Sequence, residues 1–168
     1  RDNAGSNWVV WIRGMTLNGD SSSFLKLNAA DAQSTSGQIE NVSSSLITVD
    51  GNANLSGKNQ LLYCWANVEG FSKFGTFEGN ANADGPFVYT GFRPRLVFCK
   101  SLDASENWQV RDTARSTFNA DSQVRIYWNA TSAEGAASTA SPIDFLSNGF
   151  KVRGSNSEIN ANTIAYGA

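Results

Sequence analysis

The chain has 168 residues, of which 40% are hydrophobic and 17% are charged, and its formal net charge is −2. This length and apolar fraction support a folded core, as one sizeable β domain or two small packed ones, and exclude general disorder. Lys and Arg are scattered along the chain, which excludes the basic footprint of a nucleic-acid-binding domain, and no apolar run approaches the roughly 20 residues of a membrane-spanning helix.

Short runs rich in Val, Ile, Phe, Tyr and Trp recur between clusters of Gly, Asn, Asp and Ser. Such runs are typical of strands joined by tight turns. In chain order, the clearest lie at residues 7–12, 46–49, 61–65, 85–90, 95–100 and 123–128. Residues 27–33 and 129–137 tolerate helix but lack an apolar stripe at helical spacing, so we interpret them as loops with at most one helical turn. The chain is therefore predicted to be all-β.

Asn and Ser together make up about a quarter of the chain, while charged residues are fewer than in an average soluble domain. Their side chains hydrogen-bond to nearby backbone and favour turns and loops over helix interiors. Secreted, extracellular and virion β proteins often have this composition, so we expect a virion or extracellular location.

The strongest pattern is an internal repeat. Four short blocks recur in the same order at offsets of 100 to 103 residues. They centre on Trp8 and Trp108, Asn28 and Asn129, Gly51 and Gly154, and Tyr63 and Tyr166. We therefore divide the chain into a first β repeat, residues 1–70, and a second repeat packed with it, residues 71–168.

The two repeats are predicted to be incomplete in complementary ways. A strong strand at residues 95–100 precedes Asn107-Trp108, whereas six residues precede Asn7-Trp8. The first repeat is thus expected to lack its opening strand, and the second to stop soon after Tyr166. Because an open sheet edge can pair with another segment, we expect either the upstream chain or a neighbouring subunit to supply that strand.

Enzyme chemistry has little support in the sequence. The chain has no His, which excludes Ser-His-Asp and Cys-His arrangements and His-rich zinc sites. A glycosidase needs only two carboxylates, but the acids here lie mostly in turn-like contexts, so we expect a protein that is not an enzyme. Cys64 and Cys99 lie in predicted strands and are expected to be buried free thiols, a mutual disulfide being the alternative.

Two groups of residues are candidate sites. Asn80, Asn82 and Asp84 place oxygen atoms at every second position, as in a loop that binds Ca²⁺, although a hairpin with Asx turns explains the same residues. No other cofactor is predicted. Trp11 and Trp128 have no Trp equivalent in the other repeat, so they are candidates for stacking on a sugar, whereas Trp8 and Trp108 are expected in the core.

A third candidate is the basic cluster formed by Arg93 and Arg95 around Pro94. The cluster could contact a ligand, or it could be a turn that presents two solvated side chains.

The segments 69–80, 83–94, 107–108 and 143–151 resemble a repeated β domain of bacteriophage tail and tail-fibre-like structural proteins, especially marine and cyanobacterial ones. The resemblance covers nearly the whole chain. It implies a jelly-roll or lectin-like antiparallel β-sandwich, built here from two related half-repeats and displayed on a virion. It supplies no catalytic residue.

We therefore expect a virion structural protein, a tail-fibre or tail-associated β-sandwich for assembly and host-surface glycan attachment. Its expected partners are other virion proteins or copies of itself in a homo-oligomer, with a host glycan as a further ligand and with neither nucleic acid nor membrane. Multivalency would strengthen weak glycan contacts. The alternative is a free-standing carbohydrate-binding or adhesin module of a secreted bacterial protein.

Overall fold

The computed structural model describes residues 7–16, 22–50, 53–54, 56–117, 119, 123–138 and 141–168. Within these ranges the chain forms antiparallel strands and one short helix, α1 (Ser157–Asn160). The strands are β1 (Val9–Val10), β2 (Ser23–Lys26), β3 (Ser34–Thr35), β4 (Ile39–Val42), β5 (Ile47–Val49), β6 (Phe74–Glu78), β7 (Phe87–Tyr89), β8 (Leu96–Ser101), β9 (Gln109–Asp112), β10 (Gln123–Tyr127), β11 (Gly135–Ser138), β12 (Ile143–Leu146), β13 (Gly149–Val152) and β14 (Thr163–Gly167). The predicted all-β class is confirmed. No helix in these ranges has the length and apolar character needed to cross a membrane.

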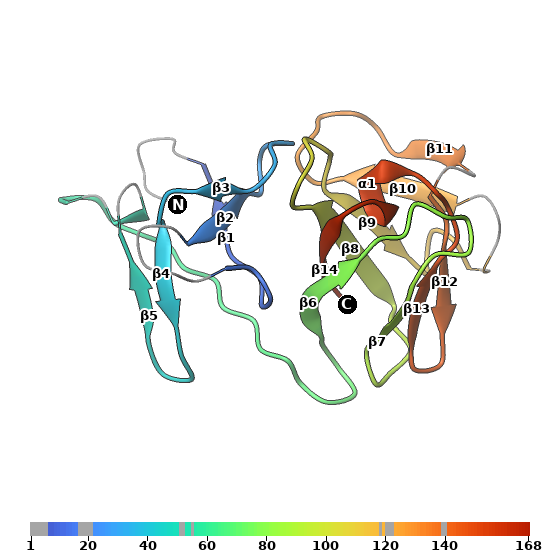
Figure 1. Cartoon of the computed structure of the whole chain (residues 1–168), viewed down its shortest axis with the longest axis horizontal. Coiled ribbons are helices and arrows are strands. Elements are labelled where there is room, and N and C mark those ends of the chain that lie inside the picture. Colours follow the sequence, from blue (N-terminus) through green and yellow to red (C-terminus); the bar gives the residue numbers. More distant parts are fainter. Residues whose placement is uncertain are drawn as a thin grey trace.

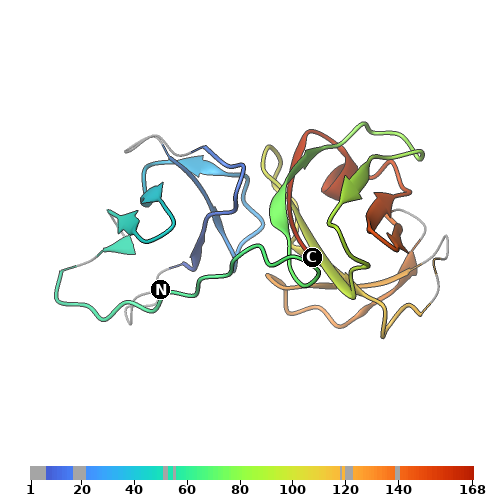
Figure 2. The same ribbon diagram turned by 90° about the horizontal axis from the view of Figure 1, so that it is seen from below.

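The strands form two lobes, visible side by side in Figure 1. The first lobe contains a sheet of order β1-β2-β3 and the hairpin β4-β5. The second contains a six-stranded sheet of order β11-β10-β9-β8-β14-β6 and a three-stranded sheet of order β12-β13-β7. Figure 2 shows the segment that follows β5 running from the first lobe to the second, and the predicted repeat boundary between residues 70 and 71 lies in this segment.

The core of the second lobe lies between its two sheets. The residues that fill it are Val88, Val97, Cys99, Ile143, Phe145, Phe150, Val152, Ile159, Ile164 and Tyr166. They come from β7, β8, β12, β13, α1 and β14. In the strands, alternate residues point to one face of the sheet, and this face lines the core. The rings of Phe150 and Tyr166 pack edge to face, with their centroids 5.5 Å apart.

A second apolar cluster joins the two lobes. Ile12, Met15 and Leu25 of the first lobe pack with Leu102, Trp108 and Ala165 of the second. The indole Nε1 of Trp108, which is 1% exposed, donates a hydrogen bond to the backbone oxygen of Lys26 at 2.9 Å. Trp108 therefore connects the lobes both by packing and by hydrogen bonding.

Asparagine side chains fix the start of β1 and the end of β2. The backbone N–H of Trp8 donates to Asn28 Oδ1 at 2.9 Å, and Asn28 Nδ2 donates to Asn7 Oδ1 at 3.0 Å. The backbone oxygen of Trp8 accepts from Leu27 N at 2.9 Å, and the strands then pair in the register Val9↔Lys26.

The same set of contacts lies at the junction of β9 and β10. The N–H of Trp108 donates to Asn129 Oδ1 at 2.8 Å, and Asn129 Nδ2 donates to Asn107 Oδ1 at 2.9 Å. The oxygen of Trp108 accepts from Trp128 N at 3.1 Å, and the next residue of β9 pairs in the register Gln109↔Tyr127. The Asn-Trp motif thus sets the strand register in the same way at both places.

The structure differs from the predicted strands at residues 61–65. This apolar run belongs to none of the strands that the structure describes. As a consequence Cys64 is exposed, so the prediction that both thiols are buried is wrong for Cys64 and confirmed for Cys99. Helix α1 was not predicted, because a single turn capped by Asn156 has no apolar periodicity to reveal it.

Candidate functional site

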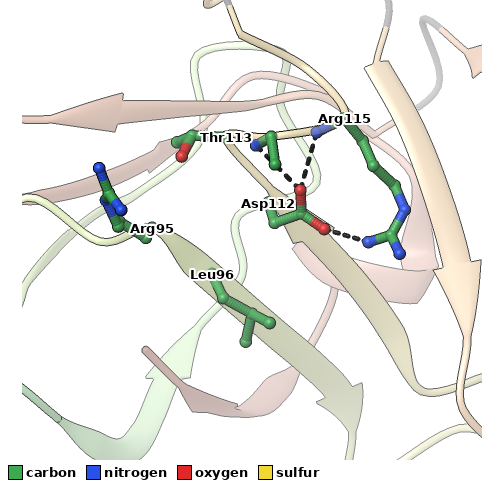
Figure 3. Close-up of a pocket in the computed structure, with 6 residues that line it drawn as sticks. Arg95, Leu96, Asp112, Thr113 and Arg115 are labelled. Atoms are coloured by element: carbon green, nitrogen blue, oxygen red, sulfur yellow. Dashed lines mark hydrogen bonds and ion pairs between the residues drawn. The ribbon is translucent and has the colours of Figure 1, made fainter.

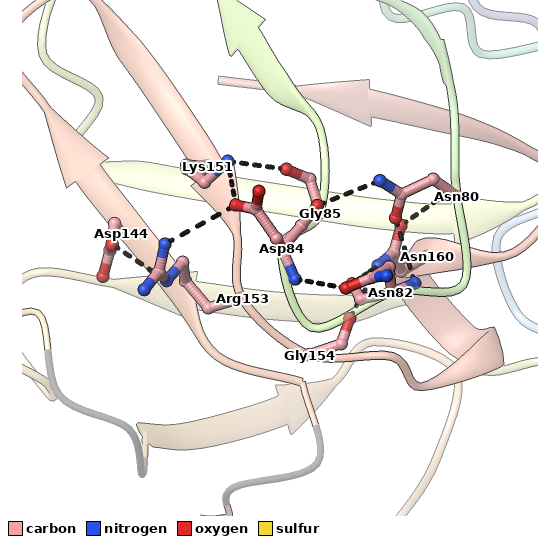
Figure 4. Close-up of polar contacts among 9 residues, drawn as sticks. All are labelled: Asn80, Asn82, Asp84, Gly85, Asp144, Lys151, Arg153, Gly154 and Asn160. Carbon is pink, nitrogen blue, oxygen red and sulfur yellow. Dashed lines mark hydrogen bonds and ion pairs between the residues drawn. The ribbon is translucent and has the colours of Figure 1, made fainter.

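The loop after β6 is held by side-chain hydrogen bonds within the loop (Figure 4). Asn80 Oδ1 accepts from Asn82 N at 3.0 Å, and Asn82 Oδ1 accepts from Asp84 N at 2.9 Å. Asn80 Nδ2 also donates to the backbone oxygen of Asp84 at 3.0 Å. These are consecutive Asx turns, in which a side-chain oxygen takes the place of a backbone acceptor.

The carboxylate of Asp84 faces two cations, one on β13 and one directly after it. Its Oδ1 lies 2.8 Å from Lys151 Nζ and 4.0 Å from Arg153 Nη1. The hydrogen bond and charge of Lys151 hold the pKa of Asp84 below its usual value. Ca²⁺ requires six to eight converging oxygen ligands. The loop offers one carboxylate that faces two cations and two amide oxygens that face N–H groups, so this set does not fit a calcium site.

Asn160 of α1 anchors this loop from the far end of the chain. The residue is fully buried, its Oδ1 accepts from Asn80 N at 2.9 Å, and its Nδ2 donates to the backbone oxygens of Asn82 at 2.7 Å and Gly154 at 2.8 Å. All the polar groups of one buried amide are thereby used to hold two loops together. The arrangement gives this region a structural role.

A hollow of about 380 Å³ lies beside the start of β8 and the end of β9 (Figure 3). The residues that line it are Arg95, Leu96, Asp112, Thr113, Ala114 and Arg115. Asp112 accepts from the backbone N–H of Ala114 and of Arg115, at 3.0 and 2.8 Å, and also pairs with the Arg115 guanidinium. The exposed guanidinium of Arg95 adds a second cation, but Arg93 does not line the hollow.

The two tryptophans predicted as candidates for sugar stacking lie in different environments. Trp11 is half-buried and packs against the apolar cluster between the lobes. Trp128 is 43% exposed, and its ring lies 4.9 Å from that of Phe98. Phe98 packs against the same cluster as Trp11, and of the four predicted ligand-binding residues only Arg95 lines the hollow described above.

A buried polar network, which sequence reasoning did not single out, lies on β9 and β10. Arg111, which is 2% exposed, donates to Ser141 Oγ, and Gln109 Nε2 donates to Glu158 Oε2 of α1. Arg125 Nη1 lies 3.7 Å from the same carboxylate oxygen. Burial lowers the pKa of the Arg111 guanidinium to about 10. The alternation of Gln109, Val110 and Arg111 is typical of a strand with solvent-facing polar residues, and only the tertiary fold covers them.

Among the residues that the structure describes, exposed large hydrophobic side chains are concentrated in residues 61–71, which we call the apolar segment. Its exposed large hydrophobic residues are Leu61, Leu62, Tyr63, Trp65, Val68 and Phe71. Trp65 is 73% exposed and Phe71 78% exposed. The ring of Tyr63 stacks on Trp8 on one side and on Trp65 on the other, with centroids 6.0 and 5.9 Å apart. The segment thus presents a row of aromatic and aliphatic side chains beside the first lobe.

Residues 1–167 match the family described as "Domain of unknown function (DUF7483)". The chain belongs to the DUF7483 family. Neither a curated protein nor a solved structure matches it. The match extends across both lobes, so the DUF7483 domain includes the apolar segment that connects them.

The two thiols of this DUF7483 domain should react very differently. Cys64 is exposed, whereas Cys99 lies in the core and burial raises its pKa to about 12. Since the thiolate is the reactive form, we expect Ellman's reagent to titrate one thiol per folded chain and two in denaturant. The Cys64→Ser variant should show none in the folded state. A second rapidly reacting thiol in the folded protein would contradict the described burial of Cys99.

Proposed function

We propose that this DUF7483 domain is a structural module of a virion tail or tail fibre that assembles with further copies of itself through the apolar segment. The observation that carries the proposal is the concentration of exposed hydrophobic side chains. Six of the eleven large hydrophobic residues exposed among those described lie within residues 61–71. Contiguous exposed apolar surface of this kind marks interaction sites in soluble proteins.

The energetics of burial support this role. Transfer of one large hydrophobic side chain from water into an interface contributes about 1.5–3 kcal/mol. Trp65 and Phe71 are mostly exposed and carry no charge. Burial of each ring in an interface would therefore contribute favourable binding free energy. Aromatic anchors of this size dominate the binding energy of many protein interfaces.

The virion location rests on the resemblance to phage tail domains. The segments that carry the resemblance include β6, β7, the turn before β8, and the hairpin β12–β13 of the second lobe. We interpret this lobe as a jelly-roll or lectin-like sandwich, because its six-stranded and three-stranded antiparallel sheets enclose one apolar core.

We further propose that the two lobes are related copies, the first lacking part of the second. Three observations support this relation. The order β1-β2-β3 corresponds to β9-β10-β11, and the hairpin β4-β5 corresponds to β12-β13. The Asn-Trp contacts also recur with the same register. The offsets between paired positions follow those of the sequence repeat.

A free-standing carbohydrate-binding module is the second candidate. The observation in its favour is that Trp128 is 43% exposed and offers a ring to a sugar face, while Arg95 and Arg115 flank a hollow. The test is a glycan array. Binding of the wild-type chain to a glycan, loss of that binding in Trp128→Ala, and a chain that remains monomeric would together favour this candidate over assembly.

The assembly role predicts a specific loss of association. The double substitution of Trp65 and Phe71 by Ser should weaken self-association at least about tenfold, equivalent to about 1.4 kcal/mol, because it removes two exposed aromatic anchors. Sedimentation velocity over a concentration series measures this effect. Trp128→Ser is the matched control, since it removes an exposed aromatic ring outside the apolar segment. A wild-type chain that stays monomeric at every concentration would overturn the proposed assembly.

A further inference from the structure

We infer that the outer face of the sheet β12-β13-β7 binds a neutral saccharide, with the rings of Phe87 and Tyr89 as its stacking surface. We call these two rings the aromatic platform. The inference goes beyond the proposed assembly role, because this sheet lies on the side of the second lobe away from the first lobe (Figure 1). It also concerns a different place from Trp128, whose ring packs on Phe98 beside the cluster that joins the lobes.

The alternation of β7 directs two aromatic rings outward. Val88 is 6% exposed and lies in the core of the second lobe, whereas Phe87 is 45% exposed and Tyr89 is 63% exposed. Because successive residues of a strand point to opposite faces, both rings lie on the outer face of the sheet. Two residues of an antiparallel strand span about 7 Å, so an oligosaccharide that runs along β7 can cover both rings.

The strand register shows what surrounds the aromatic platform. Tyr89 pairs with Gly149 of β13, which pairs in turn with the half-buried Leu146 of β12. Phe87 pairs with Lys151 of β13. Directly opposed residues share a face of the sheet. The outer face therefore has an apolar row across its three strands, and the row beside it contains both an aromatic ring and a cation.

Two glycines hold the rings against the backbone. A Cβ atom at Gly149 would lie 2.9 Å from Cε2 and Cζ of Phe87, so this ring lies over the bare backbone of β13. Gly91 has a φ of +87°, which favours glycine, and a Cβ atom there would lie 3.6 Å from Tyr89 Oη. Both rings are thus packed on backbone before any ligand arrives. A side chain that is already ordered loses little conformational entropy on binding, which favours affinity.

Two cations and two carboxylates form a polar rim beside the aromatic platform. Lys151 Nζ lies 2.8 Å from Asp84 Oδ1 and donates to the backbone oxygen of Gly85 at 2.9 Å. Arg153 Nε lies 3.5 Å from Asp144 Oδ2, and Figure 4 shows the Asp84 carboxylate between the side chains of Lys151 and Arg153. The side chain of Asp84 is 81% exposed and that of Arg153 is 45% exposed, so a ligand can reach both.

This arrangement matches the chemistry of a pyranose ring. One face of the sugar carries C–H groups that pack on an aromatic ring, and its edge carries hydroxyl groups that donate and accept hydrogen bonds. The platform offers the apolar contact, the carboxylates accept and the cations donate. The two positive and two negative charges of the rim sum to zero, which favours a neutral sugar over an acidic one. Charged residues are depleted from the cores of protein interfaces, so the position of Lys151 directly opposite Phe87 favours a sugar over a protein partner.

The test applies the full chain to an array of neutral and acidic oligosaccharides and then titrates the strongest neutral ligand by calorimetry. Phe87→Leu keeps an apolar side chain over Gly149 but removes the flat ring, and Tyr89→Ala removes the other ring. Each is expected to weaken binding at least about tenfold, whereas Phe87→Tyr should bind within about threefold of the wild type. Trp128→Ala is the matched control and should leave binding unchanged, since it removes an exposed ring elsewhere. Circular dichroism checks that each variant is folded.

Salt dependence provides an independent readout. Because a neutral sugar brings no charge to the site, its affinity should change less than about twofold when NaCl is raised, although salt screens the exposed ion pairs. Acidic oligosaccharides should bind more weakly than their neutral counterparts at every salt concentration.

Three results would overturn the saccharide site: wild-type affinity in a folded Phe87→Leu or Tyr89→Ala variant, tighter binding of acidic than of neutral oligosaccharides, or no binding to any oligosaccharide of the array. Binding that is lost only in Trp128→Ala would overturn it as well and support the second candidate function. Self-association that is weakened by Phe87→Leu and Tyr89→Ala would show that this face contacts protein instead. The dependence of self-association on Trp65 and Phe71 is measured separately, so the assembly role stands or fails independently of this site.

Discussion

Trp108→Ala is expected to lower the free energy of unfolding by about 3–5 kcal/mol, the usual range for a large aromatic residue removed from a core. Trp108 is 1% exposed and packs on Phe98 within the cluster that joins the lobes. Its indole also donates the hydrogen bond to the Lys26 oxygen. The substitution therefore leaves a cavity at the junction and an unpaired backbone oxygen on the first lobe.

Two further variants separate these contributions. Trp108→Phe retains most of the aromatic volume but loses the hydrogen bond to Lys26. We expect it to lower the free energy of unfolding by about 1–3 kcal/mol. Trp65→Ala removes a side chain that is 73% exposed and should change the stability of the monomer by no more than about 0.5 kcal/mol. Urea denaturation followed by circular dichroism measures all three. Equal losses for Trp108→Ala and Trp65→Ala would contradict the described junction.

Asn160→Asp is the second substitution for which we expect a large effect, a decrease of about 2–4 kcal/mol in the free energy of unfolding. The change conserves shape and keeps an oxygen for the N–H of Asn80. It replaces the amide nitrogen, which donates to the oxygens of Asn82 and Gly154, by a second oxygen. A buried carboxylate oxygen would then face two carbonyl oxygens, and an unsatisfied buried polar group costs about 1–3 kcal/mol, more when it is charged.

The matched control for this prediction is Asn82→Ala. That substitution removes one Asx-turn acceptor in an exposed loop but leaves the backbone oxygen that Asn160 contacts. We expect Asn82→Ala to lower the free energy of unfolding by about 1 kcal/mol or less. Thermal unfolding of both variants provides the comparison. A larger loss for Asn82→Ala than for Asn160→Asp would show that the loop, and not α1, organises this region.

Local features of the sequence determined much of the secondary structure. Short runs rich in β-branched and aromatic residues predicted β7, β8 and β10 close to their observed positions, because strand propensity and the turn residues around it are encoded locally. The Asn-Trp motifs likewise marked the two places where asparagine side chains set strand register. The absence of histidine and the richness in turn-forming residues also follow from the sequence directly, since they depend on residue types alone.

Tertiary structure decided which of these residues are buried and what they contact. Residues 61–65 have the composition of a strand, yet they belong to none of the described strands, and they are exposed, Cys64 included. The partner of the Asn80 loop, Asn160, lies 80 residues away, and no local pattern could identify it. Local periodicity specifies how a segment can pair, whereas the partner that it finds depends on the whole chain.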